Sequence, residues 1–228
     1  MLPRKWVLFC AALGLMALAS FTTGCGSSSS NAKIRLVNAI PDEGSLDLLI
    51  DTKSAATGVG YGAASSYVSV GSGSRHLQVE PSGSTTILID RTDSISSGNN
   101  LTLLSLNFSF TPPTSVLLTD DNSAPTSGNF KLRIVNASPG MGAQDVYVMP
   151  FGSGPGGAPT ISSLGLGSAG GYSTLAPGDY EVFFTQPGTT NINLDSGKLT
   201  FAAGQVRTLL GLNNPQGAFE STLLTDAN

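Results

Sequence analysis

The stretch KLRIVNASPGMGAQDVYV, residues 131–148, occurs twice in this chain in similar form. Residues 33–50, KIRLVNAIPDEGSLDLLI, share its basic start, its Asn-Ala-x-Pro break and the Asp that precedes an apolar run. The copies also end alike, with VLLTDDN at 116–122 and TLLTDAN at 222–228. A period of about 100 residues exceeds a solenoid repeat and fits one β-sandwich domain. The repeat predicts two tandem domains, at residues 33–122 and 130–228, joined by a linker at residues 123–129.

Short strands separated by turn residues account for the pattern within each copy. In APGDYEVFF, residues 176–184, a Pro-Gly-Asp turn precedes an alternating apolar run. LTLLSLNFSF, residues 101–110, is interpreted as one strand with four large side chains on one face: Leu104, Leu106, Phe108 and Phe110. No window beyond the leader keeps a helical period with caps. We therefore expect an all-β chain in which each domain packs two antiparallel sheets as a sandwich.

Composition excludes some classes of partner. The chain has 11 Lys and Arg against 15 Asp and Glu. Two of the basic residues, Arg4 and Lys5, precede the apolar leader, so the rest of the chain carries 9 − 15 = −6. Because no basic block is present, we expect no nucleic-acid partner. Glycine and proline are abundant, 28 and 13 residues, and supply turn chemistry.

The N-terminal residues have the pattern of an export signal. A positive start is followed by an uncharged apolar run at 6–21 and by Gly24-Cys25, which resembles the lipobox of bacterial lipoproteins. The resemblance implies a signal peptide at 1–24, a lipidated (palmitate-type) Cys25, and a Ser-rich tether at 25–32. We expect a chain anchored to the cell envelope, in the outer membrane if the host is Gram-negative. A single-pass anchor and a free Cys25 thiol are the alternatives; the other cysteine, Cys10, lies in the leader, so no disulfide is expected.

The repeated motifs also resemble a known family. Asn-Ala-x-Pro, the Asp-Val-Tyr-Val at 145–148, the Gly-Tyr at 171–172 and the Pro-Gly-x-Tyr-x-Val at 177–182 are similar to the bacterial domain of unknown function 4397. The resemblance covers both copies and implies secreted or lipid-anchored proteins with immunoglobulin-like or transthyretin-like sandwiches. The first copy departs from the pattern, with Leu-Leu-Ile at 48–50. The resemblance implies no activity.

Three pairs of equivalent polar residues are candidate site or scaffold residues. Asn38 and Asn136 precede the proline breaks, where an Asn side chain typically bonds the backbone of a turn, although a ligand contact is the alternative. Asp47 and Asp145 precede the second strands and are expected to accept turn N–H groups; a metal or ligand site in each copy is the alternative. Arg35 and Arg133 are predicted to form ion pairs with Asp47 and Asp145 respectively, or else to face solvent.

Two further features could carry binding. Asp120 and Asp121 adjoin the linker and are candidates for an interdomain calcium site, with a solvated acidic loop as the alternative. The Gly/Pro-rich insertion at 152–159 is the predicted binding loop, and four residues are assigned to it: Phe151, Gly152, Tyr147 and Tyr172.

The sequence contains no recognised catalytic or nucleotide-binding motif, and its only histidine is His76. We therefore expect neither an enzyme nor a cofactor. The predicted function is a monomeric surface binding or adhesion module, with an envelope glycan or a surface protein as its partner. The alternative is a structural spacer or envelope-assembly component without a ligand.

Overall fold

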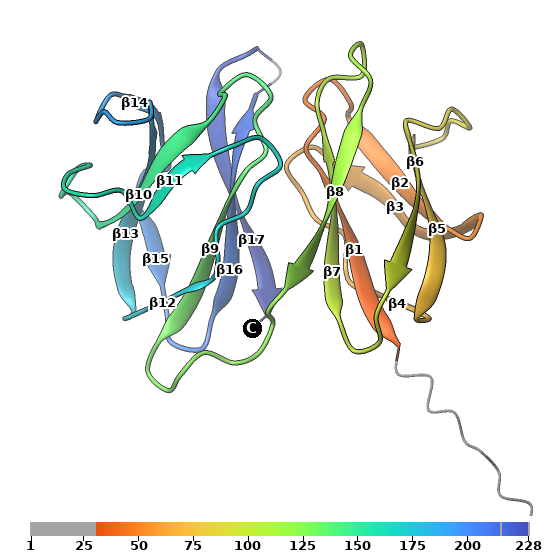
Figure 1. Ribbon diagram of the computed structural model, residues 1–228, viewed down its shortest axis with the longest axis horizontal. Coiled ribbons are helices and arrows are strands. Elements are labelled where there is room, and N and C mark those ends of the chain that lie inside the picture. Colours follow the sequence, from red (N-terminus) through yellow and green to blue (C-terminus); the bar gives the residue numbers. More distant parts are fainter. Residues whose placement is uncertain (1–30, 215, 228) are drawn as a thin grey trace, which may run out of the picture.

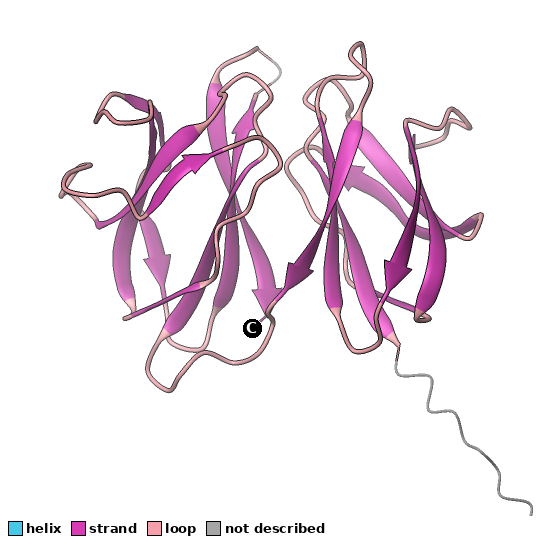
Figure 2. Cartoon of the chain, viewed as in Figure 1, coloured by secondary structure: helices cyan, strands magenta, loops and turns pink. Residues whose placement is uncertain are grey.

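The computed structural model describes residues 31–214 and 216–227, and the predicted signal peptide and Cys25 lie outside them. All regular structure in this part of the chain is β-strand (Figure 2). The first half, residues 32–120, contains β1 (Ala32–Asn38), β2 (Ser45–Ile50), β3 (Lys53–Gly60), β4 (Val68–Val70), β5 (Gly73–Pro81), β6 (Ile89–Ile95), β7 (Asn100–Leu106) and β8 (Thr114–Asp120).

The second half, residues 130–227, has a matching series of strands. They are β9 (Phe130–Asn136), β10 (Gln144–Pro150), β11 (Ile161–Leu164), β12 (Ser173–Leu175), β13 (Gly178–Thr185), β14 (Ile192–Asp195), β15 (Leu199–Phe201), β16 (Val206–Asn213) and β17 (Phe219–Ala227). The chain is therefore all-β, as predicted.

Each half packs two sheets with the same strand order. The sheets β4-β1-β7-β8 and β12-β9-β16-β17 are here called the inner sheets, and β3-β2-β5-β6 and β11-β10-β13-β14 the outer sheets; β15 also pairs with β13. The sheets are antiparallel as predicted, except that in the inner sheets β1 runs parallel to β7 and β9 runs parallel to β16. The strands between each parallel pair lie mostly in the outer sheet, so no hairpin forces the pair to be antiparallel.

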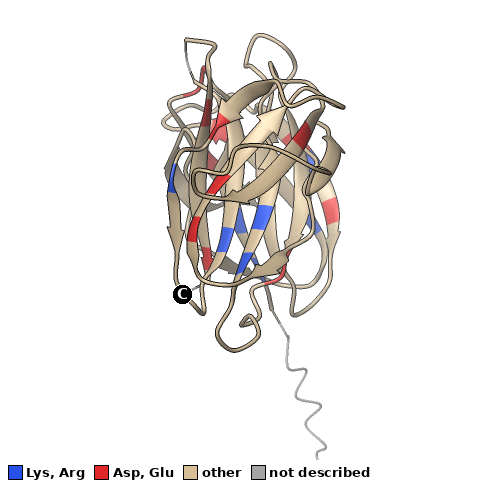
Figure 3. Cartoon of the chain, turned by 90° about the vertical axis from the view of Figure 1, so that its left-hand side faces the viewer, with Lys and Arg blue, Asp and Glu red and all other residues tan. Residues whose placement is uncertain are grey.

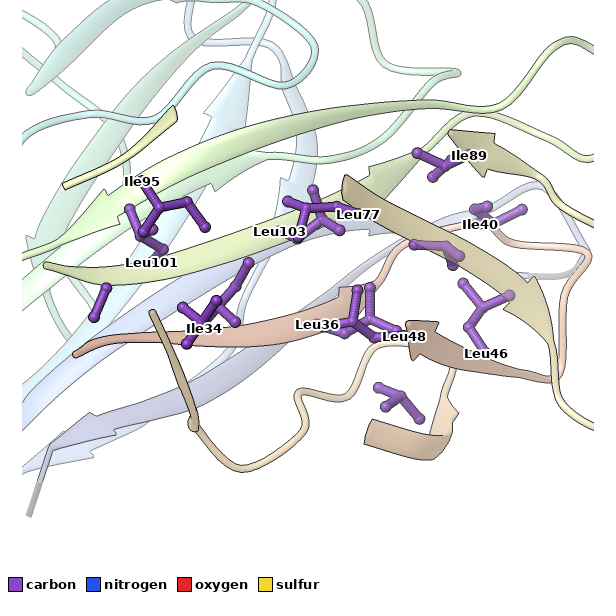
Figure 4. Packing of buried hydrophobic residues seen from close by; sticks show 14 residues of the cluster. Ile34, Leu36, Ile40, Leu46, Leu48, Leu77, Ile89, Ile95, Leu101 and Leu103 are labelled. Carbon is purple, nitrogen blue, oxygen red and sulfur yellow. The ribbon is translucent and has the colours of Figure 1, made fainter. Parts of the chain in front are cut away.

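The four sheets stack as four layers, with the two inner sheets face to face at the centre (Figure 1). One apolar cluster fills the first half between its inner and outer sheets, and Figure 4 shows its packing. A second cluster fills the second half. The third lies between the inner sheets and draws on both halves: Val37, Leu104, Leu106, Val135, Leu210 and Leu212 are among its members.

The central layer explains the uninterrupted apolar runs of the inner strands. Six consecutive residues of β7, at 101–106, and six of β16, at 208–213, are buried without the alternation of a one-sided strand. A strand covered on both faces shows this continuous pattern. The inner sheets are therefore the interior of the whole stack and not only of their own sandwich.

Strand β7 is shorter than predicted. It ends at Leu106, and Asn107 adopts a left-handed φ of 72° that turns the chain out of the sheet. Pro112 and Pro113 follow and cannot donate to a ladder. The prediction that residues 107–110 extend this strand is therefore wrong, and both Phe108 and Phe110 lie in the loop between β7 and β8.

Candidate functional site

Reciprocal ion pairs cross the seam between the inner sheets. Arg35 of the first half binds Asp226 of the second, with 2.5 Å between Nη2 and Oδ1. Arg133 of the second half binds Asp120 of the first, with 2.7 Å between the same atom types. All four side chains are at most 3% exposed. In the view of Figure 3, charged residues take up only a small part of the chain. We call these four residues the clasp.

Each clasp carboxylate is held by its own half. Asp120 Oδ2 accepts hydrogen bonds from Thr102 and Tyr67, both at 2.6 Å. Asp226 Oδ2 accepts the equivalent bonds from Thr208 at 2.6 Å and Tyr172 at 2.8 Å.

Each arginine is held in a matching way. The Arg35 and Arg133 guanidinium carbons lie 4.8 Å from the centres of the Tyr67 and Tyr172 rings respectively. Burial raises the pKa of both tyrosines, which keeps their hydroxyls protonated as donors. The clasp is therefore a satisfied buried network, in which each charge has a partner and further hydrogen bonds.

The predicted pairing of Arg35 with Asp47, and of Arg133 with Asp145, is wrong. Each arginine lies on an inner strand and each of these aspartates on an outer one, and β1 does not pair with β2 nor β9 with β10. The arginines also point away from their own outer sheet, toward the other half. Sequence proximity suggested a hairpin that the chain does not form.

Asp47 and Asp145 instead stabilise β-bulges. The register shifts at Asp47 between β2 and β3, and at Asp145 between β10 and β11. Asp47 Oδ1 accepts from the Gly58 amide at 2.7 Å, and Asp145 Oδ1 from the Ser163 amide at 2.8 Å. Both carboxylates therefore bind backbone N–H groups left unpaired by a bulge.

Asn38 and Asn136 make the same three bonds in the two halves and are fully buried. The Asn38 carbonyl oxygen accepts from the amide two residues later, and its amide group donates to the Glu43 and Val59 carbonyls. Asn136 bonds Ser138, Gly142 and Leu164 in the same pattern. These side chains fix the exit of each inner strand toward its outer sheet.

The calcium candidates are used in ion pairs. Asp120 belongs to the clasp, and Asp121 Oδ2 lies 2.7 Å from Lys131 Nζ. The hydrogen bond from Lys131 and, to a smaller extent, that from Ser123 lower the pKa of Asp121 from its ordinary 3.8 to about 2. Among the described residues, no three His, Cys, Asp or Glu side chains cluster as metal ligands.

These carboxylates make stability sensitive to acid. The hydrogen bond from the Gly188 amide and, to a smaller extent, that from the Ser163 amide lower the pKa of Asp145 below 3.8. A carboxyl with a lowered pKa binds fewer protons folded than unfolded, so its stabilising contribution is present above the unfolded pKa and falls as the pH drops from about 4 toward 2. We expect the urea midpoint to fall over this range, and to fall less for Asp145→Asn. Equal pH slopes for the two proteins would contradict this role for Asp145.

The predicted binding loop does not bring its four residues together. Phe151 is 50% exposed, and Lys198 Nζ lies 5.4 Å from the centre of its ring. Gly152 turns the chain with φ 84° and donates to Glu181. Tyr147 is buried within β10, and Tyr172 supports the clasp. The assignment of both tyrosines to a binding loop is therefore wrong.

A stacked aromatic pair, of which Phe110 is exposed and Phe108 half-buried, occupies the loop after β7. The rings of Phe108 and Phe110 stack with 5.0 Å between centroids, and Phe110 is 77% exposed. Asp42, in the turn after β1, accepts hydrogen bonds from the backbone and side chain of Ser109 between them. We call Phe108 and Phe110 the aromatic platform. Both residues continue the alternation of the β7 leucines. Because this pattern alone does not mark where a strand ends, the sequence did not predict the aromatic platform.

A groove opens along the seam between the halves. It has a volume of about 580 Å³ and is lined by residues 62–67 of the first half, residues 222–226 of the second, and Arg35. Its charged groups, Arg35 and Asp226, are already bonded to each other.

Two features of the sequence predict membrane attachment, the apolar leader and Cys25. Both precede the residues that the structure describes. Across residues 31–214 and 216–227, no helix has the length and hydropathy needed to cross a bilayer.

Comparison with solved structures gives distant similarity. A streptococcal virulence factor, described by its α-glucan binding, is 10% identical, with 83% of this chain and 96% of that chain covered and a TM-score of 0.27. A family 26 carbohydrate-binding module from Eubacterium rectale, solved with maltoheptaose, is 12% identical, with 87% and 98% covered and a TM-score of 0.27. No curated protein matches the chain.

One family profile matches, and it bears the description "domain of unknown function (DUF4397)". The match covers residues 32–147, the whole first half and the start of the second. This span is 116 of 228 residues, just over half of the chain. The chain belongs to the DUF4397 family.

Proposed function

We propose that this protein is a non-enzymatic binding module displayed from the cell envelope, with the aromatic platform as its contact surface. In this proposal the two halves are tandem copies of one domain, and Cys25 is the lipidated anchor. The identical strand order of the halves supports the first point, and the Gly24-Cys25 sequence after an apolar run supports the second.

The observation that carries the proposal is a strongly exposed phenylalanine on a fixed loop. Apolar side chains on a surface are ordinary when single, but a stacked pair with one ring 77% exposed is a patch that a partner can cover. Aromatic residues are enriched where proteins contact partners. The bonds from Ser109 to Asp42 hold the loop, so little ordering is required on binding.

The position of the platform suits a displayed surface. Strands β1 and β7 are parallel, with Lys33 opposite Asn100 and Asn38 opposite Ser105. The loop after β7 therefore lies at the far end of the sheet from the residue where the chain enters β1 (Figure 1). Seven residues of strand separate the two ends by about 20 Å. A partner can reach the platform while the N-terminal side faces an anchor.

We expect Phe110→Ala to weaken binding at least tenfold, because a central aromatic contact commonly accounts for a large share of the affinity. The soluble chain from Gly26 would be titrated against surface glycans and envelope proteins immobilised on an array. Phe151→Ala, on a loop of the second half, is the control and should bind as wild type. A loss with Phe151→Ala alone would move the site to the second half and contradict the platform.

A rigid spacer is the second candidate, and the clasp favours it. Two sandwiches joined by buried ion pairs and a shared apolar layer form one body that can hold another component away from a surface. If the folded protein binds nothing on the array, and Phe110→Ala leaves its cellular function unchanged, the spacer is the better account.

A further inference from the structure

The clasp repeats itself when the halves are exchanged. Arg35 and Arg133 occupy equivalent positions in the repeat, and so do Asp120 and Asp226. Arg35 reaches the aspartate of the second half, and Arg133 reaches the aspartate of the first. Each arginine also donates to a carbonyl of the opposite half, Thr225 at 3.0 Å and Thr119 at 3.2 Å. Each of these contacts from the first half to the second is therefore matched by the same contact from the second half to the first.

The apolar part of the seam has the same symmetry. Gly62 approaches Leu212 and Thr222 so closely that a Cβ there would lie 3.4 and 3.2 Å from their side chains. The equivalent Gly167 approaches Leu106 and Val116, at 2.9 and 3.4 Å. Leu106 and Leu212 are equivalent, as are Val116 and Thr222. Two glycines, with φ 70° and 71°, therefore occupy the same place on opposite sides of the seam.

An interface in which one residue of each partner contacts the same second residue of the other partner, in both directions, is isologous and has two-fold symmetry. We propose that the surface which each half buries against the other also fits a second copy of the same half, so that chains of this protein can pair through it. In a pair of first halves, Arg35 of each would bind Asp120 of the other. In a pair of second halves, Arg133 of each would bind Asp226 of the other.

The linker decides which pairing the intact chain adopts. Residues 121–129 connect β8 to β9 and give the halves a high effective concentration toward each other. Strand pairing does not lock this choice, because every described pairing joins strands of the same half. Pairing between chains should therefore emerge once the linker is cut.

The seam also contains an asymmetric contact. The Tyr61 hydroxyl donates to the carbonyl of Asn213 across the seam, whereas the position equivalent to Tyr61 in the second half is Leu166. In a pair of first halves the acceptor position is Asn107, which lies beyond the end of β7 with a left-handed φ of 72°, whereas Asn213 lies within β16. This bond therefore favours the first–second pair over both like pairs.

The test uses the full chain with a protease site inserted between Pro125 and Gly128. The folded chain is cut, unfolded in urea and refolded as a mixture, and its complexes are weighed by native mass spectrometry. The halves differ in mass, so all pairings are resolved. We expect first–second, first–first and second–second pairs. Exclusive first–second pairs, or folded single halves, would overturn the proposal.

Arg35→Gln gives a sharper readout. The variant loses two ion pairs from the first–first complex, one from the first–second complex and none from the second–second complex. The association constant of the first–first pair should therefore fall by about the square of the factor lost by the first–second pair. Arg75→Gln is the matched control, because Arg75 pairs with Asp51 on the outer sheet, and its side chain is 30% exposed. Unchanged proportions with Arg35→Gln would overturn the isologous assignment.

Discussion

Asp120→Ala is expected to lower the free energy of unfolding by roughly 3–5 kcal/mol, the range for removing one partner of a buried ion pair. The substitution leaves the Arg133 guanidinium, which is 2% exposed, facing the seam without its carboxylate. Thr102 and Tyr67 lose their acceptor at the same time. The cost arises mainly from desolvated groups left unsatisfied and not from the loss of an attraction.

The matched control for this prediction is Asp179→Ala. Asp179 also forms an ion pair, at 2.8 Å from Lys198, but both side chains are at least 41% exposed. Exposed pairs contribute little to stability because water and salt screen them. Urea unfolding followed by circular dichroism should give a near wild-type midpoint for Asp179→Ala and a much lower one for Asp120→Ala. Similar midpoints for the two variants would contradict the buried clasp.

Gly167→Ala is expected to destabilise the protein by a further 1–3 kcal/mol or so beyond backbone strain, as overpacking of an ordered interior does. An added Cβ would lie 2.9 Å from Leu106 Cδ1 and 3.4 Å from Val116 Cγ1, both on the opposite half. Leu106 is 2% exposed and belongs to the layer that both halves share, so the inner sheets would have to move apart.

A comparison with Gly157→Ala separates the backbone strain of a left-handed residue from steric crowding at the seam. Its φ of 72° matches the 71° of Gly167, but nothing lies within 4 Å of its added Cβ. Both variants pay the left-handed backbone cost of roughly 1–2 kcal/mol, and only Gly167→Ala also disturbs the seam. The difference between their unfolding free energies therefore measures the close approach of the halves. No difference would show that the seam accommodates a methyl group.

The repeat and the strand pattern were sufficient to predict the sandwiches. Core faces also followed from alternation, because Val182 and Phe184 face the second core as their spacing predicts. The face-to-face packing of the halves was visible only indirectly, in the continuous apolar runs of β7 and β16. For residues 101–110 the sequence was interpreted as an alternating strand, and this interpretation wrongly extended β7 through Phe110.

The partners of the clasp could not be predicted from local pattern. Arg35 and Asp226 are 191 positions apart, whereas Asp47 is close in sequence and has the right charge. The choice between them depends on which strands share a sheet, and the parallel pairing of β1 with β7 decides it. The recurrence of Arg, Asp, Thr and Tyr at equivalent positions was a usable signal for a shared role.

A double-mutant cycle between Arg35 and Asp226 tests the central claim, that the two halves form one body through the clasp. The unfolding free energies of Arg35→Ala, Asp226→Ala and the double variant would be compared with wild type. We predict a coupling free energy of at least about 1 kcal/mol for this pair, and none in the same cycle between Arg35 and Asp47. Additive effects of Arg35→Ala and Asp226→Ala would contradict the docked structure.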